Sequence, residues 1–178
     1  MTAAPHEAPA SVHPGLLAYL EEQDIPYEVL DGCVVVSPPC TFRHEDVAGE
    51  LYARLRLAAP DDLAVLGANF GFWYDDPYYV MPDITVARRS DCEDRGTFVA
   101  PLLVVEVLSP TTRRRDLMGK WNVYAEAGVP SYWLVDPVEP SLTVLALRDG
   151  VYVESGRISR SEELVVAEPF PVTVRLQR

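Results

Sequence analysis

The segment LLVVEVL at residues 102–108 constrains the fold more than any other part of the chain, because a single position in it is polar. A run of this length that is apolar on both faces is typical of a central strand, which a sheet buries on both sides. Glu106 interrupts the run. An unpaired buried carboxylate is costly, so this strand requires a partner for Glu106 from elsewhere in the chain.

A second predicted strand, PDITVA at residues 82–87, supplies another carboxylate. The polar, turn-rich segment SDCEDRGTF at residues 90–98 separates the two strands. If the strands run antiparallel around it, the start of the first lies beside the end of the second, and Asp83 comes near Glu106. Two such carboxylates repel one another unless a positive group lies between them. Mg²⁺, or Mn²⁺ in its place, is the expected cation, since Mg²⁺ takes one or two carboxylates and completes its shell with water and phosphate oxygens.

Lys120 is the one lysine in a chain that otherwise uses arginine, and it lies in the predicted helix that follows. It would bring a second positive group to the two carboxylates. In a phosphodiester hydrolase, the two carboxylates, the metal and the lysine would each have a defined catalytic role. Asp83 and Glu106 hold the metal, the metal polarises the phosphoryl oxygen and lowers the pKa of a bound water, and the ammonium stabilises charge in the transition state.

The remaining patterns predict one domain. We expect residues 1–14, rich in Ala and Pro, to form a disordered N-terminal tail, and residues 15–178 to fold as a single unit. There is no internal repeat and no linker. The other expected elements are a helix at residues 16–23, a hairpin at 27–37, a helix at 44–59, a helix at 111–128, a strand at 131–136 and a hairpin at 141–155.

Charge and cysteine content narrow the class of protein. The formal net charge of -12 disfavours loose association with nucleic acid or with an anionic membrane. Three cysteines are too few for a disulfide framework, which favours a reducing cytoplasm. No apolar segment approaches the roughly 20 residues that span a bilayer, so no membrane partner is expected.

Each candidate residue also has an ordinary structural explanation. Asp83 follows Pro82 at a strand start, where caps and turns are common, and Glu106 could pair with an arginine. Lys120 could form an exposed helix pair with Asp116, four residues earlier.

His44 with Cys40, and the arginine run that follows the predicted strand at residues 102–108, also have ordinary structural explanations. His44 falls in the apolar stripe of its predicted helix, where a histidine is more often part of the core than a ligand. Cys40 and His44 have metal-like spacing, but without a second pair we do not predict zinc. The arginines at residues 113–115 could hold a phosphate or form a solvated face.

Three segments together resemble one known family. PDITVA, the stretch LLVVEVLSPTTRRRDLMGKWNVYAEAGVPSYWLVDP, and YEVLDGCVVVSPPCTFRH are similar to the Uma family of restriction-endonuclease-like proteins, over about residues 16–137. The resemblance implies the PD-(D/E)XK nuclease superfamily. Its fold is of the α/β (α+β) class, a restriction-endonuclease-like mixed β-sheet flanked by helices, with a divalent-metal site.

The resemblance also assigns residues by position. Asp83 and Glu106 match the two motif acids. The superfamily lysine would stand at Leu108, so Lys120 would act from the next helix, as it does in this family. His44 matches the family's helix histidine and is an additional site candidate, while Glu50, beside Arg54, is a weaker one.

Two functional hypotheses follow. The first is a metal-dependent DNA endonuclease with DNA as its substrate, acting as a homodimer, since two-fold dimers are the commonest assembly and suit paired strand cuts. The second is a catalytically inactive module that keeps the nuclease fold for protein binding or dimerisation. Convergence of Asp83, Glu106 and Lys120 on one open site would favour the first, and Lys120 pointing into solvent against Asp116 would favour the second.

Overall fold

β8 (Leu103–Val107) lies inside a six-stranded sheet, as its apolar sequence predicts. The structure is a computed structural model that describes residues 12–30, 32–36, 38–75, 78–109, 119–160 and 162–176. The strand order of this central sheet is β11-β10-β9-β8-β6-β3. β8 pairs antiparallel with β6 and parallel with β9, so the sheet is mixed. The other strands of the sheet are β3 (Leu63–Gly67), β6 (Ile84–Arg88), β9 (Ser131–Asp136), β10 (Ser141–Arg148) and β11 (Val151–Ser159).

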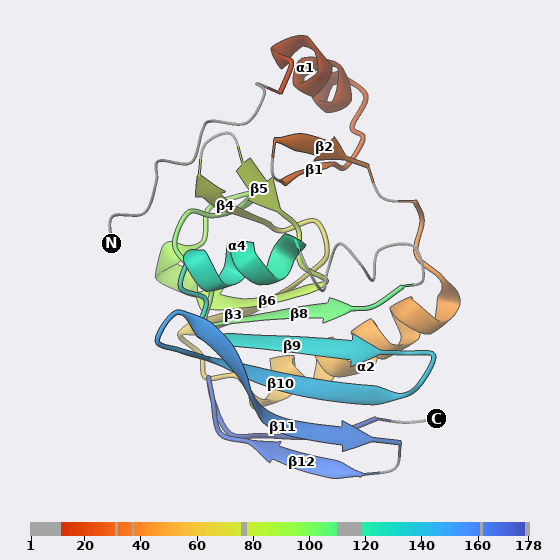
Figure 1. Ribbon diagram of the computed structural model, residues 1–178, viewed down its shortest axis with the longest axis vertical. Helices are drawn as coiled ribbons and strands as arrows, with labels where there is room; N and C mark the ends of the chain where they lie inside the picture. The colour runs from red at the N-terminus through yellow and green to blue at the C-terminus, as the bar shows by residue number, and fades with distance from the viewer. Residues whose placement is uncertain are drawn as a thin grey trace.

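A five-stranded sheet with the order β2-β1-β5-β4-β7 forms the other end of the molecule, at the top of Figure 1. Its β1–β2 hairpin is antiparallel, as predicted. The segment between residues 61 and 79, which the sequence leaves unassigned, supplies β3, β4 and β5. The strands of this sheet are β1 (Glu28–Leu30), β2 (Cys33–Val35), β4 (Gly71–Asp75), β5 (Tyr78–Val80) and β7 (Gly96–Thr97). A separate antiparallel pair consists of β12 (Glu163–Val166) and β13 (Val172–Arg175).

Two helices cover the central sheet on opposite faces (Figure 1). α2 (Phe42–Ala58) buries Leu51 and Leu55 in the same cluster as the odd-numbered residues of β8. α4 (Trp121–Glu126) buries Val123 and Tyr124 in the cluster that contains Val104. Because successive side chains of a strand point to opposite faces, each helix packs on one set of β8 residues. Both faces are therefore closed, which is why β8 is apolar throughout except at Glu106.

The turns explain several element boundaries. α2 begins two residues before the expected start, because Thr41 caps it by accepting a hydrogen bond from the His44 amide. The hairpin of β10 and β11 turns at Asp149 and Gly150, whose positive φ angles of 50° and 78° suit a tight hairpin. The 3-10 helix η1 (Arg89–Asp91) lies in the turn-rich segment after β6.

Some sequence predictions fall on residues that are not described. Residues 1–11 of the expected tail lie outside the described residues, and α1 (Pro14–Glu22) begins at the expected edge of the domain. The predicted helix at 111–128 is described from residue 119 onward, where Gly128 with φ of 80° follows α4. None of the helices in the described ranges is long and apolar enough to cross a membrane.

Candidate active site

Glu106 lies on the face of β8 that α4 covers, and it is 3% exposed. It shares this face with Val104, whereas Val105 and Val107 point toward α2. The strand alternation thus carries the carboxylate into an otherwise apolar layer. The sequence predicts a partner for Glu106, and the structure supplies one.

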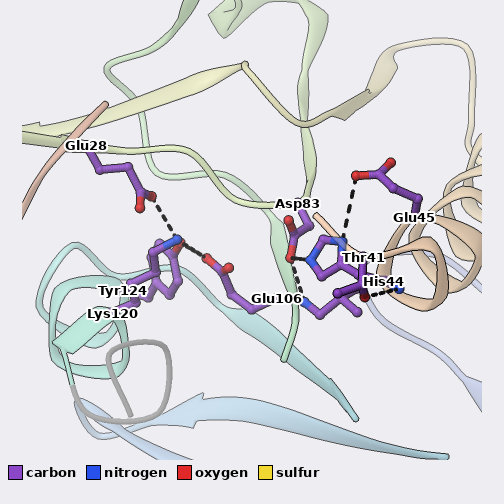
Figure 2. Close-up of polar contacts among 9 residues, drawn as sticks. Glu28, Thr41, His44, Glu45, Asp83, Glu106, Lys120 and Tyr124 are labelled. Carbon is purple, nitrogen blue, oxygen red and sulfur yellow. Dashed lines mark hydrogen bonds and ion pairs between the residues drawn. The ribbon is translucent and has the colours of Figure 1, made fainter. Parts of the chain in front are cut away.

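Lys120 is that partner. Its Nζ atom lies 2.9 Å from Oε1 of Glu106 and 2.8 Å from Oε1 of Glu28, and the lysine is 3% exposed. Figure 2 shows the ammonium between the two carboxylates. Lys120 therefore does not point into solvent. Asp116, the alternative partner, lies outside the described residues.

Two further groups fix the carboxylates of this cluster. The hydroxyl of Tyr124 donates to Oε1 of Glu106 at 2.6 Å, and the amide of Met81 donates to Oε1 of Glu28 at 2.8 Å. Burial, followed by the nearby charge of Glu106, raises the pKa of Tyr124 well above its ordinary value, so the hydroxyl stays a donor. We call Glu28, Lys120 and Glu106 the buried ion triad. The ammonium of Lys120 and the hydrogen bonds from Tyr124 and Met81 compensate its buried carboxylates.

Asp83 stands immediately before β6, at the edge where β8 ends. The pairing of Ile84 with Val105, continued by one residue, places Asp83 opposite Glu106. The predicted antiparallel arrangement is thus confirmed. Oδ2 of Asp83 accepts a hydrogen bond from the amide of Val107 at 2.7 Å, and the side chain is 18% exposed. Among Asp83, Glu106 and Lys120, Asp83 has the most exposed side chain.

His44 approaches Asp83 from the first turn of α2. Its Nε2 atom lies 3.2 Å from Oδ2 of Asp83, and the histidine is 6% exposed. The hydrogen bond to Asp83, with a further contribution from its charge, raises the pKa of His44 despite burial. Its Nδ1 atom is buried and makes no hydrogen bond within the described part of the chain. His44 is therefore neither a fully satisfied core residue nor a solvated one.

The two acids hold different partners (Figure 2). Glu106 belongs to the buried ion triad on the α4 face, and Asp83 belongs with His44 on the α2 side. Their donor chemistry fits Mg²⁺ or Mn²⁺, because both offer carboxylate oxygens. Oδ2 is the oxygen of Asp83 that makes the hydrogen bonds found in the described residues, so Oδ1 can accept a cation.

Other sequence candidates are less central. Glu50 forms an ion pair with Arg54 at 2.8 Å along α2, and the side chains are 30% and 32% exposed. The arginines at residues 113–115 lie outside the described residues.

Sequence reasoning missed Glu28 and the contact of Tyr124. Glu28 had the same signal as Glu106, an acid inside an apolar strand, whereas Tyr124 reads as an ordinary core position.

Comparison with known proteins agrees with this fold. A solved "putative nuclease belonging to DUF820" from Anabaena variabilis ATCC 29413 superimposes with a TM-score of 0.69 at 18% identity, over 90% of each chain. At this identity the likeness shows the fold alone, a nuclease-like one. No curated protein matches the chain. The family model described as "Uma2: Putative restriction endonuclease" matches residues 14–177, which confirms the resemblance seen in the sequence. The chain therefore belongs to the Uma2 family.

Proposed function

We propose that this protein is a divalent-metal-dependent DNA endonuclease that hydrolyses phosphodiester bonds. Asp83 and Glu106 would hold Mg²⁺ or Mn²⁺, and Lys120 would act on the scissile phosphate. The observation that carries the proposal is the buried contact of Lys120 with Glu106, on the strand whose register sets Asp83 opposite. Asp83 and Glu106 stand at the same end of β8, Glu106 contacts Lys120, and the family resemblance implies two acids and a lysine for such nucleases.

Each residue of the candidate site has a defined role in this proposal. When bound, the metal would polarise the phosphoryl oxygen and lower the pKa of a bound water. Asp83, whose side chain is more exposed than that of Glu106, offers its Oδ1 oxygen, and the Val107 amide holds its Oδ2 in place. His44 orients Asp83 from the other side through Nε2. Lys120 supplies an ammonium near the transferred charge, and Glu28 positions that ammonium.

Substrate and assembly follow from the same proposal. With a net charge of -12, the chain offers little general attraction to DNA, so binding would depend on the metal and a few local cations. A two-fold homodimer would allow paired cuts on the two strands.

One observation favours the second candidate, a catalytically inactive module for protein binding or dimerisation. The buried ion triad is closed, since the side chains of Glu28, Lys120 and Glu106 are 3–5% exposed. A closed set of this kind can also serve a structural purpose, with Lys120 retained to neutralise two carboxylates.

Plasmid nicking separates the two candidates. The wild-type protein should nick supercoiled DNA with Mg²⁺ or Mn²⁺ and not with EDTA. Asp83→Asn and Glu106→Gln should each abolish nicking without unfolding the chain, because both replacements are isosteric and Lys120 keeps Glu28 as a partner. Glu154→Gln is the matched control, an exposed acid paired with Arg157. Equal nicking by all variants, or by wild type in EDTA, would refute the proposed site.

A further inference from the structure

Three potential metal ligands gather where α2 begins. The ligand atoms of Cys40, His44 and Glu45 all lie within 4.8 Å of one another. We call these residues the α2-start cluster. Within the described residues no other group of three or more such side chains is as tightly gathered. The cysteine–histidine pair that the sequence leaves incomplete thus gains a third ligand from the fold.

Local helix geometry builds this cluster. Thr41 is the N-cap of α2, and its Oγ1 atom accepts a hydrogen bond from the His44 amide at 3.3 Å. Cys40 therefore stands just before the cap, and Glu45 is the fourth helical residue. Side chains at these two positions commonly touch across the helix start. His44, the third helical residue, turns inward between them, so the chain itself brings the three groups together.

His44 is already held as a metal-binding histidine is held. Its Nε2 atom contacts Oδ2 of Asp83 at 3.2 Å, and its Nδ1 atom is buried with no hydrogen-bond partner in the described part of the chain. Histidines that bind metals usually donate the other ring N–H to a carboxylate, which fixes the tautomer and orients the ring. Figure 2 shows Nδ1 facing the carboxylate of Glu45, and the two atoms lie 3.9 Å apart.

The surroundings of Cys40 favour a cation. Partial desolvation first, then a hydrogen bond to Glu45 and the charges of Asp83 and Glu45, raise the pKa of the Cys40 thiol to about 11. The nearby carboxylates of Asp83 and Glu45 attract a metal ion, and binding then displaces the thiol proton. Cys40 and Glu45 are both exposed, which leaves a path for an ion from solvent.

We propose that Sγ of Cys40, Nδ1 of His44 and a carboxylate oxygen of Glu45 bind one divalent transition-metal ion of the zinc class, with the fourth position open to solvent. A thiolate and an imidazole select such an ion over Mg²⁺. Ligand atoms about 2.0–2.3 Å from a tetrahedral ion stand about 3.5 Å apart, so the His44–Glu45 distance of 3.9 Å must shorten by about 0.4 Å. The two exposed side chains can make this adjustment. The three ligands do not include Asp83 or Glu106, although Asp83 holds Nε2 of His44, and the proposal does not rest on nuclease activity.

Cobalt substitution tests the site without any measurement of activity. The reduced, EDTA-stripped full chain is titrated with Co²⁺ and followed by absorption. Wild type should bind one equivalent and develop the thiolate-to-Co²⁺ charge-transfer band in the near ultraviolet, and Zn²⁺ should remove the band. Cys40→Ser should lose the band. Cys33→Ser is the matched control, since Cys33 is also an exposed free cysteine, and it should keep the band in full.

A second variant tests the orientation of His44. Asp83→Asn removes the carboxylate that holds Nε2, so Co²⁺ affinity should fall about 10- to 100-fold while the charge-transfer band persists at saturation. No band in wild type, or a full band in Cys40→Ser, would overturn the proposal. Circular dichroism of each variant shows whether a lost band reflects a lost ligand. Because Cys40 is exposed, the serine variant should keep the wild-type spectrum, and loss of the band in a folded Cys40→Ser chain supports the site.

Discussion

Replacing Lys120 by methionine should destabilise the folded chain strongly. Lys120 lies 2.8 Å from Glu28 and 2.9 Å from Glu106, and the three side chains are nearly inaccessible to solvent. With an effective dielectric constant of about 20, each attraction is about 6 kcal/mol before the cost of burying the charges. Methionine fills a similar volume but removes the ammonium that contacts both buried carboxylates. The net loss should be about 3–5 kcal/mol, as for other buried pairs that lose one partner.

Thermal and urea denaturation measure this loss. For a chain of 178 residues, about 1 kcal/mol shifts the unfolding midpoint by roughly 2–4 °C, so the midpoint should fall by roughly 6–20 °C. Arg157→Met is the control. It breaks the 2.6 Å pair with Glu154, whose side chains are 58% and 47% exposed, and should leave the midpoint almost unchanged.

A triple variant isolates the electrostatic cause. Lys120→Met combined with Glu28→Gln and Glu106→Gln removes all three charges, while Tyr124 and Met81 can still donate to the amide oxygens. Its stability should return to within about 1–2 kcal/mol of wild type, because a neutral replacement of a buried ionic group is often tolerated. A midpoint for Lys120→Met within about 2 °C of wild type would refute the reasoning, as would a triple variant as unstable as the single one.

Three further predictions concern metal, pH and salt. Mg²⁺ or Mn²⁺ should raise the unfolding midpoint of wild type but not of Asp83→Asn, and equal shifts by calorimetry would count against Asp83 as a ligand. The pKa of His44 is raised in the folded state, so its protonation stabilises the fold below its unfolded pKa of 6.5 and this gain is lost as pH rises through the folded pKa. His44→Gln in EDTA should therefore cost more stability at about pH 5.5 than at about pH 9, and a cost independent of pH would contradict this. DNA affinity measured against salt should show the slope of only a few phosphate contacts, and a slope near −10, as for a large repressor, would reveal a basic surface that has been overlooked.

The order of the strands could be predicted in large part from local patterns. The run at residues 102–108 predicts a buried strand, and the turn signals at Gly32 and at Asp149 and Gly150 predict two hairpins that are confirmed. Periodicity and turn chemistry are properties of neighbouring residues, so the sequence expresses them directly. The segment around residues 61–79 lacked this clarity, because its strands β3, β4 and β5 are short and belong to two different sheets.

The candidate site, like the fold, could be predicted from the sequence only in part. The sequence alone shows that Glu106 requires a partner, because the cost of burying its charge depends only on its apolar neighbours. It could not show that Lys120 serves Glu28 as well, since Glu28 reaches the site through a strand of the other sheet. Nor could it show that Asp83 contacts His44 of α2 while Glu106 faces α4. Those contacts join segments far apart in the chain, and only the packing of α2, α4 and two sheets decides which charged groups share a buried space.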